Sequence, residues 1–443
     1  MTGDGATPDP ADEPGSPRPG RSRRRFLGLA GAAVLAGAAG VGVVAARPGD
    51  GDEAGGGADP GTTDEVRVEP VVLPYRGDHQ AAVNAPLAPA AIVVGLDVRA
   101  GNADDLAATL TALGDAAEAV MSGEPSPTRP GGAAPIDNGL LGPEPGPNGV
   151  GVIIGYGAGL FDERFGLADR RPSELRTMPR FPNDRLVTEA RSNGDLSLVV
   201  TGDTAEAAIS ALRRILRATR GDLVPRWMQE GFNRIDPTAG PGRAPGRNLL
   251  GFKDGTANLD GADATVMDAH VWVQPDDGEP LWTVGGTYQA IRLIRMMVEF
   301  WDRTRLSEQE AVFGRERDSG APIGGTEETE VPVFTDGTLN SHIARANPRT
   351  PGSERHLMLR RGFNYSAGLD ENDQLDEGLI FTCYQRSLDD GFIAVQRALD
   401  GEPLEEYIRP TGGGLFFVPP PPDPGEAFGA ALFDPGRAEP AST

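Results

Sequence analysis

The stretch AIVVGLDV, residues 91–98, and the segment that follows it from Ala103 to Met121 decide the fold class. The first is a short continuous apolar run, as expected for a buried β-strand. The second carries apolar residues at roughly helical spacing, namely Leu106, Leu110, Leu113 and Val120. A buried strand followed directly by an amphipathic helix indicates mixed α and β structure.

The same alternation continues along both halves of the chain. In the first half, strands are predicted at 149–157 and 196–202 and a helix at 205–219. The second half has strands predicted at 285–297, 356–362, 379–385 and 412–419, with helices beginning at Val298 and spanning 388–399. This order predicts an α+β fold of two ferredoxin-like β-α-β-β-α-β modules packed together, as in a dimeric α+β barrel.

Composition divides the chain into segments. Gly, Pro and Asp without periodicity predict a disordered linker, and a Pro-rich end predicts a flexible tail. The predicted segments are an export signal (1–46), the linker (47–66), a first module (67–230), a second module (231–420) and the tail (421–443).

The N-terminus resembles a twin-arginine export signal. SRRRFLG, residues 22–28, is followed by an uncharged Ala-, Gly- and Val-rich run to Ala46. We therefore expect export to the periplasm or beyond, with the twin-arginine translocase as a partner. An uncleaved membrane anchor has the same pattern and stays open, as does the cleavage point.

Charge and cysteine content exclude some functions. The net charge is −24, so the surface should repel nucleic acid and anionic lipid. The single cysteine, Cys383, excludes an internal disulfide and a multi-cysteine metal site.

Three motifs carry candidate chemistry. Asp254 lies in LLGFKDGTANLDG (249–261), where Asp-Gly could form a simple turn capped by Thr256 or Asn258, or present a reactive carboxylate. His342 precedes Ala344 and Ala346, which leave room for a flat ligand. One imidazole suffices for haem iron, although a structural hydrogen bond would explain this histidine equally well.

The third motif is LMLRRGFNYS, residues 357–366. Strand alternation places Leu357, Leu359 and Arg361 on one face and Met358, Arg360 and Gly362 on the other. An inward guanidinium would need an anionic partner, because burying a lone charge is costly. Pairing of both arginines with surface acids is the alternative.

Taken in order, GFKDGTANL (251–259), GGTYQAIRLIRMMVEFWDRTRLSEQEAVFGR (285–315), SHIARANPR (341–349), LRRGFNY (359–365) and CYQRSLDDGFIAVQ (383–396) resemble the dye-decolourising peroxidases. The resemblance covers approximately residues 85–420 and is closest to the branch exported through the twin-arginine pathway. The Gly-x-x-Asp-Gly motif of that family corresponds to Gly251–Gly255.

The resemblance implies haem b in the second module, with His342 as the iron ligand. It implies catalytic roles for Asp254 and Arg360 on the peroxide-binding face. Further residues expected against haem are Gly255, Thr256, Ala257, Asn347, Pro348, Arg349 and Arg360, with Arg349 a candidate partner of a propionate. The family pattern has an aspartate where this chain has Ser387, so the residue that orients His342 is left open.

The expected function is a secreted peroxidase that reduces hydrogen peroxide and oxidises dyes, phenols or similar one-electron donors. Asp254 would act as acid and base, and Arg360 would stabilise the peroxide. A haem-handling or iron-acquisition protein, similar to a deferrochelatase, would use the same pocket. A binding protein without cofactor is a third hypothesis, and the physiological donor and homo-oligomerisation are left open.

Overall fold

The computed structural model describes residues 72–127, 134–234 and 246–437, which belong to one compact unit. The predicted export signal and the linker lie outside these ranges. Within the described part of the chain, no helix is long and apolar enough to cross a membrane.

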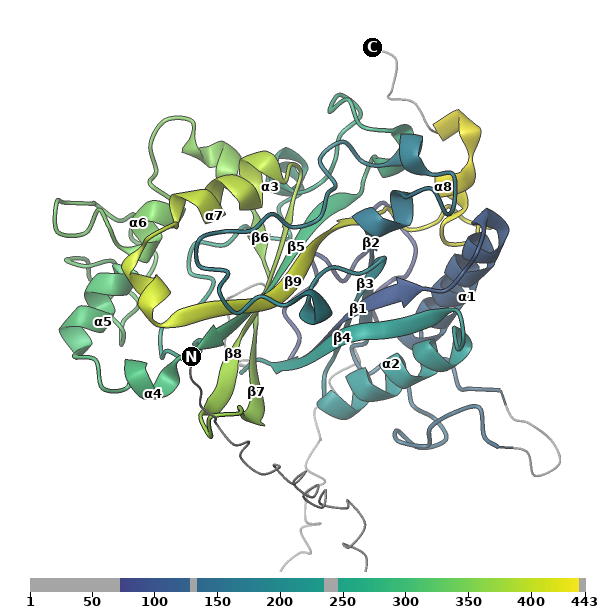
Figure 1. The fold of residues 1–443 in the computed structure, drawn as a ribbon, viewed down its shortest axis with the longest axis horizontal. Helices are drawn as coiled ribbons and strands as arrows, with labels where there is room; N and C mark the ends of the chain where they lie inside the picture. Colours follow the sequence, from purple (N-terminus) through teal and green to yellow (C-terminus); the bar gives the residue numbers. More distant parts are fainter. Residues whose placement is uncertain (1–71, 128–133, 235–245, 438–443) are drawn as a thin grey trace, which may run out of the picture. The chain divides into compact units, whose positions relative to one another are not determined.

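The first module has the predicted β-α-β-β-α-β order (Figure 1). Its antiparallel strands lie in the order β2-β3-β1-β4. The elements are β1 (Ala90–Val98), α1 (Ala103–Met121), β2 (Gly151–Gly157), β3 (Leu196–Gly202), α2 (Ala205–Ala218) and β4 (Leu223–Phe232). The boundary predicted after residue 230 falls inside β4, a strand whose mixed polar sequence gave no continuous apolar run.

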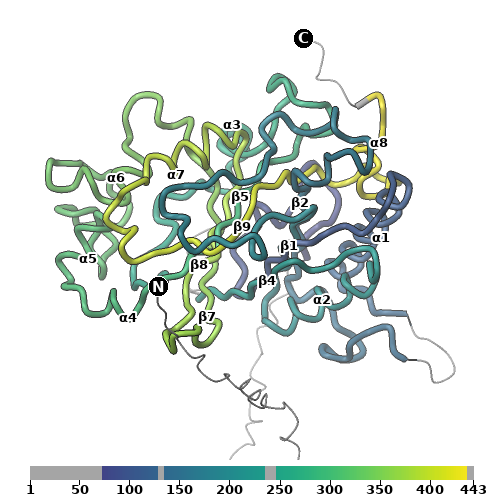
Figure 2. Tube along the Cα trace, viewed as in Figure 1, coloured from purple at the N-terminus to yellow at the C-terminus, as the bar shows by residue number. Residues whose placement is uncertain are grey.

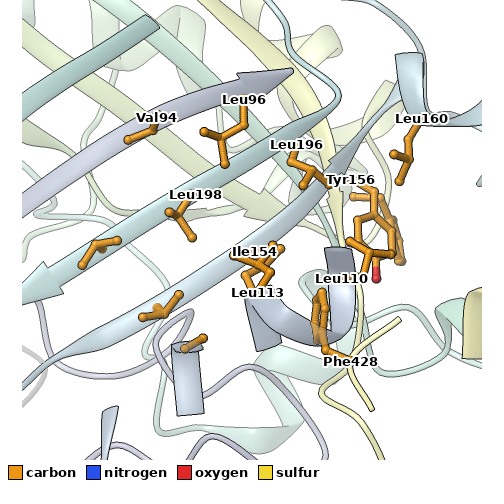
Figure 3. Packing of buried hydrophobic residues seen from close by; sticks show 14 of the residues in the cluster. Val94, Leu96, Leu110, Leu113, Ile154, Tyr156, Leu160, Leu196, Leu198 and Phe428 are labelled. Carbon is orange, nitrogen blue, oxygen red and sulfur yellow. The ribbon is translucent and has the colours of Figure 1, made fainter. Parts of the chain in front are cut away.

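Local chemistry fixes where the two helices of this module begin. The Asn102 side chain accepts a hydrogen bond from Asp105 N at 2.9 Å, and Thr204 accepts one from Ala207 N at 3.2 Å. The apolar face of α1 then packs on the outer face of the sheet, where Leu110 and Leu113 meet Ile154 (Figure 3). Both helices cover the same side of the sheet.

The second module repeats this arrangement, with strand order β9-β5-β8-β7. Its strands are β5 (Thr287–Met296), β7 (Phe363–Leu369), β8 (Leu375–Gln385) and β9 (Ile408–Val418). Its helices are α3 (Ala264–His270) before β5, then α4 (Val298–Trp301), α5 (Leu306–Phe313) and α6 (His342–Ala346), and, after β8, a π-helical turn (Asp389–Ile393) and α7 (Ala394–Ala398).

The two sheets join at both edges into one closed barrel. β4 pairs with β7 at Phe232 and Asn364, and β2 pairs with β9 through Tyr156 and Gly157. Because β5 also pairs with β8, the nine-stranded sheet closes on itself. The enclosed faces form an apolar cluster that includes Val93, Ile153, Ile291, Phe363, Ile380 and Phe416. The prediction of paired ferredoxin-like modules is confirmed.

The strand predicted at 356–362 is displaced in the structure. Ser353–His356 forms a 3₁₀ turn, and strand pairing begins only at β6 (Leu359–Arg360). β6 and β7 keep one register against β8, and Arg361 N donates to Thr382 O at 2.7 Å between them. They therefore act as one long strand, interrupted at Arg361 and Gly362.

The predicted flexible tail is packed against the first module as far as it is described. Phe428 and Leu432 are 4% and 1% exposed and belong to the core beside α1. The last described residues, which include α8 (Ala430–Phe433), run next to α1 (Figure 2), and a Cβ on Gly429 would lie 2.7 Å from Leu110 Cδ1. The Pro-rich composition of this segment predicted a flexible tail and gave no sign that Phe428 and Leu432 would be buried.

We predict that Leu432→Ala lowers the free energy of unfolding by about 2–4 kcal/mol, because it removes a buried side chain and leaves a cavity. Leu369, on β7, is 62% exposed, so Leu369→Ala is the matched control and should change stability by less than about 0.5 kcal/mol. Denaturant unfolding measures both. Equal effects of the two substitutions would contradict the packed tail.

Candidate active site

The loop that carries Asp254 is shaped by its two motif glycines. Gly251 and Gly255 have φ values of 87° and 91°, the left-handed region that favours glycine. Between them, Phe252 is buried and stacks on Phe313 with ring centroids 4.1 Å apart. The Asp254 backbone N–H donates to Gly246 O at 3.1 Å. The turn is therefore anchored by an aromatic side chain and presents the half-buried Asp254.

Asn258 ties this loop to the strand that carries Arg360. Its amide donates to Arg360 O at 2.7 Å and accepts from Arg360 N at 2.8 Å. The same contact brings Asp254 to the junction of β6 and β7, since a Cβ on Gly362 would lie 3.7 Å from Asp254 Oδ2. The sequence offered Asn258 only as a turn cap, because its partner lies about a hundred residues away.

His342 opens α6 and is oriented by Glu402. His342 Nδ1 donates to Glu402 Oε2 at 2.8 Å, and the Glu402 side chain is only 2% exposed. Burial disfavours the imidazolium, but the charge and hydrogen bond of Glu402 outweigh it, so the pKa of His342 is raised. The Phe313 ring links this histidine to the Asp254 loop, because its centroid lies 6.1 Å from the His342 ring and 4.1 Å from that of Phe252.

Three arginines of the second module, Arg315, Arg349 and Arg360, have no carboxylate partner in the part of the chain that the structure describes. Within the described ranges, no carboxylate pairs with Arg349 or Arg360, and Arg315 donates only to the carbonyls of Gly320 and Glu328. Burial lowers the pKa of Arg315 first, and the nearby charge of Arg349 lowers it further. In an acid-rich protein, unpaired clustered guanidinium groups indicate a site for an anionic ligand.

Comparisons with known proteins identify the family. Residues 80–233 match the N-terminal model of Dyp-type peroxidases, and residues 245–422 match the C-terminal model. This chain belongs to the Dyp-type peroxidase family. It is 42% identical to a deferrochelatase of Escherichia coli over 95% of this chain and 98% of that protein.

Solved structures agree. An oxyferrous complex of DtpA from Streptomyces lividans has a TM-score of 0.72 and 32% identity, over 82% of this chain and 98% of that chain. A DyP-type peroxidase from Cellulomonas bogoriensis gives the same values. Members of this family are haem-dependent enzymes, and haem is the cofactor of this chain.

The residues of this family member fit haem. The hydrogen bond of His342 Nδ1 leaves Nε2 available as a ligand, and 27% of this side chain is accessible although protein surrounds it. The apolar Phe313 side chain packs against the His342 ring, with centroids 6.1 Å apart. An imidazole, apolar side chains and unpaired arginines are the chemistry that an iron porphyrin with propionates requires.

The question left open by Ser387 has an answer in the structure. The Ser387 hydroxyl donates to Glu174, at 2.9 and 3.0 Å from its two oxygens, and has no contact with His342. Glu402, in the loop between α7 and β9, supplies the carboxylate instead. Sequence reasoning missed Glu402, because a glutamate in an acid-rich loop gives no signal until the fold brings it to the histidine.

The remaining histidines lie elsewhere. His79 Nδ1 donates to Gly285 O at 2.7 Å while its ring stacks on Trp272, and His356 Nδ1 contacts Asp390 O. Burial lowers the pKa of His270. In the described residues, no three His, Cys, Asp or Glu side chains are grouped as a metal site.

We predict that Asn258→Ala destabilises this family member by about 2 kcal/mol, because the Arg360 backbone loses both partners. Asn372 is exposed and its side chain makes no hydrogen bond in the described ranges, so Asn372→Ala should cost less than about 0.5 kcal/mol. Chemical denaturation compares the two. A negligible loss in Asn258→Ala would show that the bridge to Arg360 does not hold the loop.

Proposed function

We propose that this chain is an exported peroxidase that reduces hydrogen peroxide and oxidises dyes, phenols or similar one-electron donors with haem b. Two contacts support this most directly. Asn258 joins the Asp254 loop to Arg360, and Phe313 packs against both Phe252 of that loop and the His342 ring, with centroids 4.1 and 6.1 Å apart. A carboxylate, a guanidinium and an imidazole are the acid-base, electrostatic and ligand groups that peroxide reduction at haem needs.

His342 holds the iron in this proposal, and Glu402 holds His342. The Nδ1 hydrogen bond fixes the ring orientation and increases the electron density at Nε2. Bound haem supplies the redox centre at which peroxide takes up two electrons and two protons to give two waters, the electrons coming singly from donor molecules. Arg349 pairs with a propionate through charge-assisted hydrogen bonds. The segments Gly255–Ala257 and Asn347–Arg349 line the cofactor.

Asp254 moves the proton. Its carboxylate takes a proton from one peroxide oxygen and delivers it to the other, which leaves as water. Arg360 stabilises the negative charge that develops on peroxide as the oxygen–oxygen bond breaks. The hydrogen bonds of Asn258 to the Arg360 backbone hold the Asp254 loop against the strand that carries Arg360. Acid-base and electrostatic groups therefore act from one preorganised junction.

The proposal that the protein is exported rests on the sequence alone. The arginines at 23–25 and the uncharged run to Ala46 support passage through the twin-arginine translocase, either as a cleaved signal or as a retained anchor. The protein would then meet peroxide and donors outside the cytoplasm.

Removal of iron from haem is a second candidate function. It is favoured by the 42% identity to the Escherichia coli deferrochelatase, which covers nearly the whole chain. Product analysis separates the two activities. Peroxide-dependent dye oxidation supports the peroxidase, whereas iron-free porphyrin, detected by its fluorescence after incubation of the haem-loaded protein, supports iron removal.

We predict that Asp254→Asn lowers peroxide-dependent dye oxidation by about 10²- to 10⁴-fold. Arg360→Leu should lower it by about 10²- to 10³-fold. Both variants should retain haem, as shown by the Soret absorbance, because neither supplies the ligand. The control is Asp318→Asn, whose side chain is 89% exposed. Dye oxidation within threefold of the unsubstituted protein in Asp254→Asn would reject the assigned role.

We predict that Glu402→Ala weakens haem retention about 10- to 100-fold, because His342 loses the carboxylate that orients it. The rate of haem transfer to excess apomyoglobin, followed by absorbance, measures this loss. Glu406, an exposed acid of the same loop, provides the control Glu406→Ala, which should leave the rate unchanged. Equal rates in both variants would mean that Glu402 does not hold His342 in place.

A further inference from the structure

The two residues on either side of the Asp254–Gly255 pair are held by one carboxylate. Lys253, the only lysine of the chain, forms an ion pair with Glu328 through Nζ and Oε2. Thr256 Oγ1 donates to the other oxygen, Oε1, of Glu328 at 3.1 Å. Glu328 therefore binds the turn on both sides of Asp254, through the Lys253 and Thr256 side chains.

The backbone at Glu328 is itself fixed. Arg315 is 7% exposed and donates to Glu328 O at 3.0 Å and to Gly320 O at 2.6 Å. Arg315 and Glu328 belong to the segment between α5 and α6, residues 314–341, whose ends touch each other: Gly314 packs so closely against Ser341 that a Cβ has no room. The segment that binds the neighbours of Asp254 thus ends directly before His342.

The Asp254 carboxylate has no such fixing of its own. Among the described residues, it makes no hydrogen bond or ion pair, and only its backbone N–H is bound, to Gly246 O. The direction in which this side chain points therefore depends on the backbone of the turn. That backbone is held on both sides by Glu328.

We propose that Glu328 is a positioning residue for Asp254, acting through Lys253 and Thr256, and that it couples the turn to the segment leading to His342. The proposal rests on the peroxidase function proposed above. Lys253 and Glu328 side chains are 33% and 32% exposed, so solvent screens the pair and it contributes little to global stability. Its effect falls on the placement of Asp254, where small displacements are costly for proton transfer.

The test compares Glu328→Ala with Glu327→Ala in the full haem-loaded protein. Glu327 is the adjacent acid, is exposed and makes no side-chain contact in the described part of the chain, so its substitution removes the same charge without touching the turn. In stopped-flow mixing with hydrogen peroxide, the second-order rate constant should fall on the order of tenfold in Glu328→Ala. It should stay within twofold in Glu327→Ala, with haem retention unchanged in both.

Rescue distinguishes positioning from a general structural role. Glu328→Lys should lower the peroxide rate at least as much as Glu328→Ala, because it places two cations together. Combining it with Lys253→Glu restores an ion pair of opposite polarity and should recover most of the lost rate. Failure of the double variant to exceed the single one would overturn the ion-pair part of the proposal.

A readout independent of activity separates this proposal from the proposed function. Hydrogen exchange of the peptide spanning residues 249–261 should accelerate in Glu328→Ala and not in Glu327→Ala. If the unsubstituted protein does not react with peroxide but exchange in 249–261 still accelerates in Glu328→Ala, the peroxidase assignment fails. The role of Glu328 in holding the turn is then still supported. If exchange in 249–261 and the peroxide rate both match the unsubstituted protein, Glu328 does not position Asp254.

Discussion

Closure of two sheets into one barrel is the constraint on which the remaining structure depends. The seams are short, since β4 meets β7 only at Phe232 and Asn364 and β2 meets β9 only at Tyr156 and Gly157. Cohesion must therefore come from the enclosed apolar cluster and from contacts outside the seams. One of these is the buried ion pair of Arg292, on β5, with Asp184 of the first module, each 2% exposed. Breaking either partner would leave a buried charge uncompensated.

Because β6 lies on this closed sheet, adjacent arginines serve opposite faces. Arg361 points into the barrel, where its guanidinium donates to the carbonyls of Ala85 and Pro86 and burial lowers its pKa to about 10. Strand alternation places Arg360 on the outer face with Met358, which packs in the cluster outside the barrel. The alternation expected from the sequence is confirmed for this pair, but the anionic partner expected for the inward arginine is replaced by backbone carbonyls. Only the outward arginine remains available for a ligand.

Sequence pattern predicted the parts of this protein that are locally determined. The bounds of α1 and β3 match, because continuous apolar runs and helical periodicity are properties of neighbouring residues. The misses are non-local. β4 alternates in burial because one face lines the barrel, and Phe428 and Leu432 are buried by α1 rather than by their own segment. Asn258 and Glu402 likewise acquire their roles only when the fold brings distant residues to them.

The electrostatics of the site follow from how acids are distributed rather than from how many there are. Acidic residues exceed basic ones by 65 to 41, yet Arg349 and Arg360 have no carboxylate partner in the described ranges. The buried Glu402 is hydrogen-bonded to His342, and Glu328 is bound to Lys253 and Thr256. These two acids thus orient functional residues instead of neutralising an arginine. The unpaired charges of Arg349 and Arg360 are therefore available to anionic ligands. In a haem-dependent enzyme these are the haem propionates and, in the proposed reaction, the peroxide anion.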